Sequence, residues 1–315
     1  MPGSKSPSRS APTVFIDGEA GTTGLEIRDR LALARDITVR SIDPDKRKDA
    51  DARRALMGEV DLVVLCLPDE AAKEAVALAD GLGKKAPKIV DASTAHRVAA
   101  DWTYGFPELD LAQRSAIIKA KRVSNPGCYP TGAIALLRPL VEAAIVPVGH
   151  AITINAVSGY SGGGKSMIES YEVKKTAPSF ELYGLALEHK HVPEIEKYSR
   201  LARRPIFVPS VGNFRQGMLV SVPLHLSALP GKPSLEDLRE TLAKHYAGAR
   251  LVSVVDAATF KGRIAAEDLN GTDKMQLTVF GNAEHGQAVL VARLDNLGKG
   301  ASGAAVQNIR LMLGL

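Results

Sequence analysis

Cys128 is the residue whose surroundings most clearly suggest chemistry. It lies in the segment SNPGCYPTG, residues 124–132, directly before the apolar run of residues 133–137. This pattern predicts a turn followed by the start of a helix, where the positive end of the helix dipole favours a thiolate over a thiol. A thiolate in a partly exposed turn is a nucleophile. A buried structural cysteine is the alternative, and the position of Cys128 alone leaves both interpretations open.

A pair of histidines offers a proton-transfer partner for this cysteine. His189 and His191 precede VPEI, residues 192–195, and an extended segment would present both rings on one face. Because imidazole titrates near neutral pH, either ring is a candidate general acid or base for Cys128. A metal site is another use of two histidines, but no third ligand of matching spacing is visible, and we predict no metal. Histidines on a solvated surface loop are the remaining interpretation.

A glycine-rich turn near the start of the chain predicts dinucleotide binding. The segment GEAGTTG, residues 18–24, lies between a strand pattern and a helix pattern. Such a turn brings the backbone close to a dinucleotide and aims a helix N-terminus at its pyrophosphate. The spacing GxxGxxG differs from the usual GxGxxG, so an ordinary turn between strand and helix is the alternative. The predicted cofactor-binding residues here are Gly18, Gly21, Thr22, Thr23 and Gly24.

The residues after the second predicted strand bear on the choice between NAD and NADP. Asp43 lies just beyond the strand pattern of residues 37–42, where an acidic side chain binds the ribose hydroxyls of NAD. Ser41, Arg47 and two neighbouring lysines surround it, and these side chains favour a 2′-phosphate and therefore NADP. Since a run of charges is also typical of a solvated loop, these residues alone leave the choice open.

A second glycine-rich segment imitates a nucleotide-binding motif. GYSGGGKS, residues 159–166, matches the P-loop pattern GxxxxGK[ST], which by itself predicts nucleoside-triphosphate hydrolysis. The β-rich surroundings differ from the parallel core of a P-loop protein, and no later strand pattern ends in an Asp suited to holding Mg²⁺. We therefore expect a loop that lets substrate or nicotinamide approach the backbone closely, with Lys165 contacting an anionic group.

Two kinds of secondary-structure pattern divide the chain. Residues 13–124 alternate strands and helices, which predicts a parallel, doubly wound sheet of the Rossmann type. From about residue 150, long β-rich runs are interrupted by one clear helix over residues 234–246, which predicts a mostly antiparallel sheet with helices on one face. A last helix is expected over residues 303–313. The predicted fold class is α/β, with an α+β second domain.

Composition narrows the classes of partner. The 315 residues are 45% hydrophobic, enough for a sizeable core in two domains. The net charge of +5 comes without a basic patch rich in aromatics, so we expect an anionic small molecule and not nucleic acid. Two cysteines, the other being Cys66 in an apolar strand pattern, indicate a reducing cytoplasm. No apolar run reaches ~18 residues, so no membrane span is expected. Residues 1–11 are polar and rich in Ser and Pro, which predicts a disordered tail.

Three motifs together resemble the N-acetyl-γ-glutamyl-phosphate reductase family, a relative of the aspartate-semialdehyde and glyceraldehyde-3-phosphate dehydrogenases. The motifs are SNPGCYPT at residues 124–131, HxHxPEI at 189–195 and DNLxKGAxGxAVQN at 295–308. The resemblance covers roughly residues 13–315, and the opening FIDGEAGTTGL at 15–25 resembles the shorter bacterial subtype.

The resemblance implies a two-domain enzyme that uses NADP. Residues 12–125 and 297–315 would form the NADP-binding Rossmann domain. Residues 126–296 would form the α+β domain that carries the substrate site and the subunit contact. The family is oligomeric, so the resemblance implies a cytoplasmic homodimer or homotetramer.

The resemblance also implies a reaction and residue roles. The Cys128 thiolate would attack N-acetyl-γ-glutamyl phosphate, phosphate would leave, and NADPH would reduce the thioester to N-acetyl-glutamate 5-semialdehyde, in arginine biosynthesis. His189 or His191 would exchange protons, with a slight preference for His191. Arg215 departs from the family's pattern because Gln216 separates it from the following glycine. The implied substrate-binding residues are Arg97, Asn125, Ser158 and Arg215, and the implied cofactor-binding residues are Ser41, Arg47 and Asn296.

Two other interpretations share the cysteine or the cofactor. A related semialdehyde dehydrogenase would act on aspartyl phosphate or on a lysine-pathway analogue, and the HxHxPEI segment argues against aspartyl phosphate. A non-catalytic NADP-binding sensor would have the same fold without the catalytic residues. The intact cysteine motif and the histidine pair argue against such a sensor.

Overall fold

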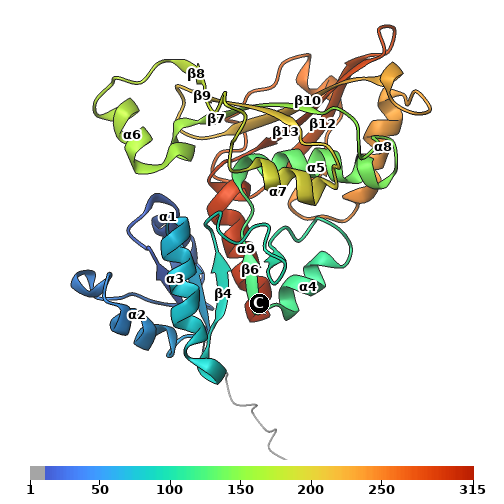
Figure 1. Cartoon of the computed structure of the whole chain (residues 1–315). Coiled ribbons are helices and arrows are strands. Elements are labelled where there is room, and N and C mark those ends of the chain that lie inside the picture. The colour runs from blue at the N-terminus through green and yellow to red at the C-terminus, as the bar shows by residue number, and fades with distance from the viewer. Residues whose placement is uncertain (1–10) are drawn as a thin grey trace, which may run out of the picture.

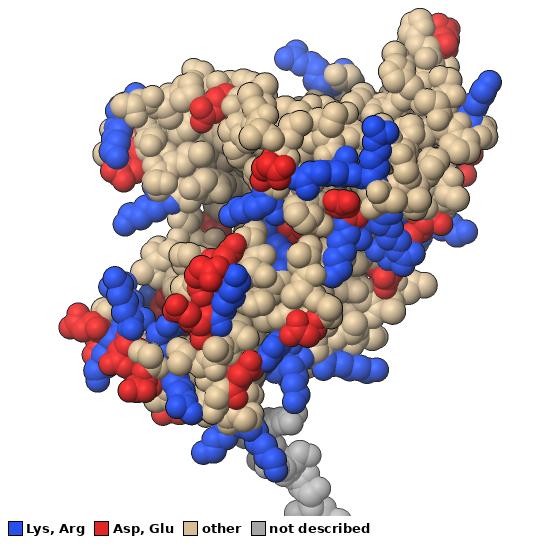
Figure 2. Space-filling model, in the orientation of Figure 1, with Lys and Arg blue, Asp and Glu red and all other residues tan. Residues whose placement is uncertain are grey.

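The computed structural model of the chain describes residues 11–315, arranged around two β-sheets that lie one above the other in Figure 1. The predicted disordered tail, residues 1–11, lies outside the described residues except for Ala11. No helix among the described residues is both long and apolar enough to cross a membrane. Figure 2 shows charges of both signs mixed over one face, and a hollow between the two parts of the molecule on the left.

The first sheet is parallel throughout and has the strand order β2-β1-β3-β4-β6-β5. β3 is apolar and buried along its whole length, as expected for a parallel strand covered on both faces. The strands are β1 (Thr13–Asp17), β2 (Thr38–Arg40), β3 (Leu62–Leu65), β4 (Lys88–Asp91), β5 (Thr103–Tyr104) and β6 (Arg122–Ser124).

Helices cover both faces of this sheet, which confirms the predicted Rossmann-type α/β architecture. One apolar cluster joins α1 (Thr22–Ala32), α4 (Gln113–Lys119) and α9 (Gly303–Leu313) to one face. A second cluster joins α2 (Ala50–Met57) and α3 (Asp69–Asp80) to the other. The C-terminal helix therefore returns to the sheet built by the first third of the chain, as Figure 1 shows.

The second sheet is mixed, so the prediction of a mostly antiparallel sheet is wrong. Its order is β11-β12-β13-β10-β7-β9-β8, and the pairs β7–β9 and β11–β12 are parallel. A long crossover through α6, β8 and α7 separates β7 from β9, and such a connection returns the chain in the same direction. The strands are β7 (Thr153–Gly159), β8 (Phe180–Leu182), β9 (Ile206–Gly212), β10 (Met218–His225), β11 (Val252–Val254), β12 (Met275–Asn282) and β13 (Gln287–Leu294).

The helix α5 (Cys128–Glu142) is the central element of the second part of the molecule. Residues 129–141 of this helix are buried, and they pack against β10, β13, α7 and α8 in one large apolar cluster. The N-terminal end of α5 also contacts the π-helix η6, so it lies where the two parts of the molecule meet. The other helices here are α6 (Gly164–Glu172), α7 (Val192–Ser199) and α8 (Leu235–His245), and η6 spans Gly298–Ser302.

Candidate active site

Cys128 is the first residue of α5, as the sequence pattern predicts. Its N-cap is Gly127, whose extended backbone makes no side-chain capping bond, so the first amides of the helix have no side-chain cap. The strand β6 ends at Ser124, and the Asn125 amide donates to the Asp91 carbonyl oxygen at the end of β4 (2.7 Å). The turn before Cys128 is therefore anchored to the carboxyl edge of the parallel sheet, where ligands bind in open α/β folds.

Burial controls the state of this thiol. Cys128 is half-buried, and burial raises the pKa of its thiol to about 11, although the Arg97 charge and backbone N–H groups at the helix start act in the opposite direction. The expectation that the helix dipole yields a thiolate is therefore wrong, because the cost of desolvating the charge is larger than the stabilisation at the helix start. Cys128 is a thiol at neutral pH and needs a base to act as a nucleophile.

Three polar side chains converge on Gly127, the residue before the cysteine. A Cβ atom added at Gly127 would lie 2.6 Å from Arg97 Nη1, 2.7 Å from His191 Nε2 and 3.0 Å from Glu194 Oε2. Any larger residue at position 127 would displace these groups, so the glycine of the SNPGCYPT segment lets them approach the turn. The predicted residues Arg97 and His191 are thus brought together beside Cys128.

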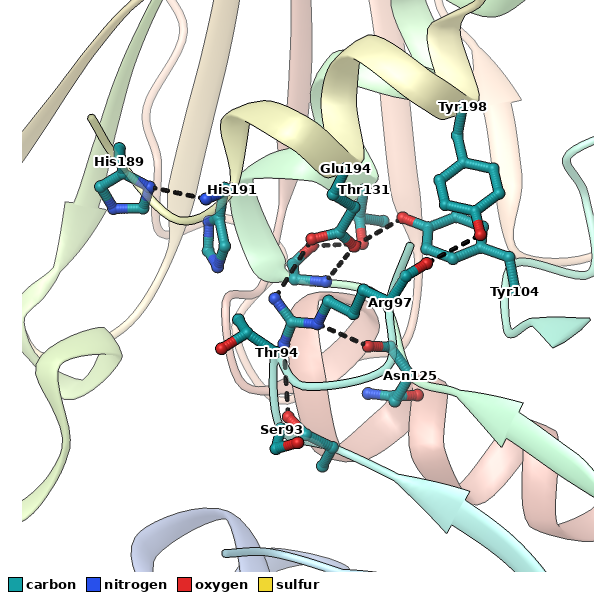
Figure 3. Close-up of polar contacts among 12 residues, drawn as sticks. Ser93, Thr94, Arg97, Tyr104, Asn125, Thr131, His189, His191, Glu194 and Tyr198 are labelled. Atoms are coloured by element: carbon teal, nitrogen blue, oxygen red, sulfur yellow. Dashed lines mark hydrogen bonds and ion pairs between the residues drawn. The ribbon is translucent and has the colours of Figure 1, made fainter. Parts of the chain in front are cut away.

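The two histidines have different surroundings, as Figure 3 shows. The His191 amide donates to His189 Nδ1 (3.1 Å), and the His189 ring lies edge-on to Tyr129 and Phe207. His191 is 7% exposed, and its buried Nδ1 has no hydrogen-bond partner among residues 11–315. Burial lowers the pKa of His189 to about 4 and that of His191 well below its usual value, so both imidazoles are neutral at pH 7.

Glu194 connects the groups around the cysteine turn (Figure 3). Its Oε1 accepts from the Gly127 amide (2.8 Å) and from the Tyr104 hydroxyl (2.7 Å), and its Oε2 accepts from Arg97 Nη1 (3.2 Å). Glu194 is 1% exposed. Sequence reasoning did not single out Glu194, although it belongs to the HxHxPEI segment. A carboxylate between the apolar residues Val192 and Ile195 is the signal that could have revealed it.

Arg97 is held on several sides. Its Nε donates to the Asn125 carbonyl (3.0 Å) and its Nη2 to the Ala92 carbonyl (3.3 Å), while the Tyr198 hydroxyl donates to its own carbonyl (2.7 Å). With the bond to Glu194, three of the five N–H groups of the guanidinium have partners. The other two N–H groups can donate to an anion. Contact between Arg97 and the substrate stays a prediction.

The other predicted substrate and nicotinamide residues bind protein groups. Asn125 donates to the Ala301 carbonyl (3.0 Å), and Asn296 accepts from the Gly217 amide (2.8 Å). Ser158 donates to the adjacent Gly159 carbonyl (3.0 Å). Their ligand contacts stay predictions.

Arg215 lies apart from the group around Gly127. Its exposed side chain forms an ion pair with Glu172 at the end of α6. Lys165, the lysine of the P-loop-like segment, is exposed in the first turn of α6. Neither side chain is among those that converge on Gly127, and their contacts with anions stay predictions.

The glycine turn of residues 18–24 has the shape that a dinucleotide needs. Gly18 has a φ of +91°, and a Cβ atom there would lie 2.2 Å from the Cys66 carbonyl oxygen, so only glycine fits. Gly21 is the N-cap of α1 and supplies no side-chain cap, which leaves the amides of Thr22 and Thr23 for an anion. The residues present therefore fit the pyrophosphate of NADP.

The residues predicted to read the cofactor's ribose lie beyond β2. Asp43 caps a short helix by accepting from the Asp45 amide (3.0 Å), and Arg47 Nε donates to the Pro44 carbonyl (2.8 Å). Ser41 Oγ donates to Glu19 Oε1 (3.0 Å). No cluster of His, Cys, Asp or Glu within residues 11–315 is arranged to hold a metal ion.

The thiol pKa predicts a steep pH dependence of alkylation. Because the Cys128 thiol has a pKa of about 11, its reaction with iodoacetamide should accelerate about tenfold per pH unit between pH 7 and pH 10. Peptide mass spectrometry separates Cys128 from Cys66, whose pKa burial raises to about 12. An alkylation rate at Cys128 that is already independent of pH near neutrality would contradict this prediction. It would show that Cys128 is a thiolate at neutral pH.

Comparisons with known proteins agree with this fold and site. Residues 24–118 match the family model for the semialdehyde dehydrogenase NAD binding domain, and residues 128–296 match that for the semialdehyde dehydrogenase dimerisation domain. Solved structures of aspartate semialdehyde dehydrogenases share the fold. That from Francisella tularensis has a TM-score of 0.72 at 13% identity, covering 96% of this chain and 100% of its own. That from Candida albicans, solved with NADP, has a TM-score of 0.69 at 15% identity, covering 96% and 99%.

The fold and the cysteine site thus define a protein of the semialdehyde dehydrogenase class. The N-acetyl-gamma-glutamyl-phosphate reductases of Brucella ovis and Brucella suis are each 54% identical to this chain over 309 residues, covering 96% of it and 99% of each relative. The chain belongs to the N-acetyl-gamma-glutamyl-phosphate reductase family, as the sequence motifs indicate.

Proposed function

We propose that the protein reduces N-acetyl-γ-glutamyl phosphate to N-acetyl-glutamate 5-semialdehyde and phosphate with NADPH, as a step of arginine biosynthesis. The observation that carries the proposal is the convergence of Arg97, His191 and Glu194 on Gly127, directly before Cys128. A cysteine, a neutral imidazole and a cation at one helix start suit the transfer of an acyl group from phosphate to sulfur.

The first step forms a covalent intermediate on Cys128. His191 takes the proton from the thiol, the thiolate attacks the acyl carbon, and the carbon–oxygen bond to phosphate breaks to leave a thioester and free phosphate. Burial first, and then the Arg97 charge, lower the pKa of His191 and disfavour its imidazolium form. The negative charge of the substrate offsets the effect of Arg97 and so favours proton uptake by this ring. The base therefore becomes effective when the anionic substrate binds.

The second step reduces the thioester. NADPH, when bound, supplies the hydride. The Cys128 amide at the helix start is a natural donor to the carbonyl oxygen as its charge develops. Collapse of the resulting thiohemiacetal breaks the carbon–sulfur bond and releases the aldehyde, and His191 returns the proton to sulfur.

His191 is the better candidate for the acid–base role. Its Nε2 lies beside Gly127, and no group in the described part of the chain binds its Nδ1, so both tautomers of its ring remain accessible. His189 uses its Nδ1 to accept from the His191 amide, which favours the Nε2–H tautomer and a supporting role.

The remaining roles follow the sequence predictions. Arg97, Asn125, Ser158 and Arg215 are proposed to contact the substrate, and the residues of the glycine turn with Ser41, Arg47 and Asn296 the cofactor. Residues 12–125 with 297–315 would form the NADP domain. Residues 126–296 would form the catalytic domain, through which copies of the chain assemble as a cytoplasmic homodimer or homotetramer.

The reverse reaction tests the proposal directly. Purified protein with N-acetyl-glutamate 5-semialdehyde, phosphate and NADP⁺ should reduce the cofactor, as measured by absorbance of the nicotinamide, and the reaction should stop when phosphate is omitted. Aspartate semialdehyde in place of the substrate should give no reduction. Absence of reduction despite NADP⁺ binding would overturn the assignment, and faster reduction with aspartate semialdehyde would favour the related dehydrogenase.

A further inference from the structure

Glu19, Arg28 and Ser41 form a small polar cluster beside the glycine turn. Glu19 Oε1 accepts from Ser41 Oγ (3.0 Å) and pairs with Arg28 Nε (3.1 Å). The Glu19 side chain is only 14% exposed, whereas that of Arg28 is 53% exposed. The carboxylate is therefore held in place, while the cation that it binds is free to turn toward solvent.

The cluster lies at the position where dinucleotide-binding folds read the adenosine ribose. Glu19 follows β1 after one glycine, and Ser41 follows β2 directly. These strands are parallel neighbours, so both residues lie at the same edge of the sheet. In such folds an acidic side chain at the end of the second strand binds the 2′-hydroxyl of NAD, and a cation there binds the 2′-phosphate of NADP.

The first carboxylate after β2 is engaged as a helix cap. Asp43 accepts from the Asp45 amide as the cap of a short helix, and the Nε–H of Arg47 is bound to the Pro44 carbonyl. Glu19, carried by the neighbouring strand, is thus the carboxylate in contact with Ser41. Two donors suited to a 2′-phosphate are in contact with it: Ser41 Oγ–H donates to Glu19 Oε1, and Arg28 Nε pairs with the same oxygen.

We propose that Glu19 is a specificity-determining residue that limits discrimination between NADPH and NADH. Its carboxylate competes with a 2′-phosphate for Ser41 and Arg28 and places a like charge beside that phosphate. The same carboxylate can accept a hydrogen bond from a 2′-hydroxyl. Removal of its charge should therefore strengthen binding of 2′-phosphorylated ligands alone. The inference rests on the proposed cofactor site and adds to it the residue that sets the preference.

Fragment binding isolates the contribution of the 2′-phosphate. Adenosine 2′,5′-bisphosphate and adenosine 5′-monophosphate differ by that group only, and titration calorimetry at low salt gives the ratio of their Kd values. In Glu19→Gln the bisphosphate should bind about tenfold tighter and the monophosphate within about twofold of the parent, with the gain reduced at high salt. In Arg28→Gln the bisphosphate should bind about tenfold more weakly.

A matched variant removes the same charge from the opposite edge of the sheet. Asp36 lies before β2 and pairs with Arg310 on α9 (2.7 Å), so Asp36→Asn should leave the Kd ratio unchanged. If NADPH binds the parent protein, two results would overturn the role proposed for Glu19. These are an unchanged ratio of the two Kd values in Glu19→Gln, or an equal weakening of binding for both fragments. Failure of the parent protein to bind NADPH or either fragment would instead overturn the cofactor site itself, and this inference with it.

Discussion

Replacing Cys128 with serine is expected to reduce phosphate-dependent turnover by at least about 10⁴-fold, because a hydroxyl at this position is a far weaker nucleophile and leaving group than a thiol. The neutral imidazole of His191 can remove a proton from a thiol with a pKa of about 11 far more easily than from an alcohol. NADP⁺ binding should be unchanged, since the glycine turn of residues 18–24 lies in the other part of the fold. Initial rates from the nicotinamide absorbance, together with a binding titration, measure both quantities.

Cys66 provides the matched control for this substitution. It follows β3 and lies beside the first sheet, where burial and the carboxylates of Asp91 and Asp17 raise the pKa of its thiol to about 12. Cys66→Ser should therefore keep turnover within about twofold of the parent, because its thiol takes no part in the reaction. Turnover above about 1% of the parent rate in Cys128→Ser would be inconsistent with a thioester and would require a different nucleophile.

Substitution of Glu194 with glutamine should have the next largest effect, through positioning and not through contact with the reacting atoms. The carboxylate holds the Gly127 amide, the Tyr104 hydroxyl and the Arg97 guanidinium. An amide in its place turns N–H groups toward a buried cation, and loss of one partner from a buried ion pair costs about 3–5 kcal/mol of unfolding free energy. We expect kcat to fall about 100-fold with little change in NADP⁺ affinity, since misplacement of reacting groups by about 1 Å has this magnitude.

The alkylation profile distinguishes positioning from general loss of structure. Glu194 raises the pKa of Cys128 and Arg97 lowers it, so removing the Glu194 charge should speed alkylation at pH 8 while turnover falls. Tyr104→Phe keeps the carboxylate and removes one donor, which should cost about 1 kcal/mol of stability and less than tenfold in kcat. Equal losses in both variants, or slower alkylation in Glu194→Gln, would argue against the role given to this carboxylate.

Local patterns in the sequence were sufficient to locate the main parts of the molecule. The apolar run before the glycines is β1, the turn of residues 18–24 leads into α1, and Cys128 begins a helix. The last helix spans Gly303–Leu313, the interval that its apolar spacing predicts. Each of these features depends on neighbours within a few residues, because backbone preference and helix periodicity are local properties.

Other features depend on contacts between distant segments and only the tertiary structure decided them. The parallel pairing of β7 with β9 follows from how a long crossover returns, which no strand pattern encodes. The raised pKa of Cys128 results from burial by surrounding elements, and this overrides the local effect of the helix start.

The polar network around the cysteine has the same origin. Glu194 contacts Arg97 and Gly127 across separations of 97 and 67 residues. Glu19, after β1, contacts Ser41, after the neighbouring strand β2, across 22 residues. The sequence by itself thus identified the family, and it predicted Cys128 as the nucleophile and the turn of residues 18–24 as the cofactor site. The protonation states and the partners of the charged side chains required the fold, because burial and long-range pairing set both.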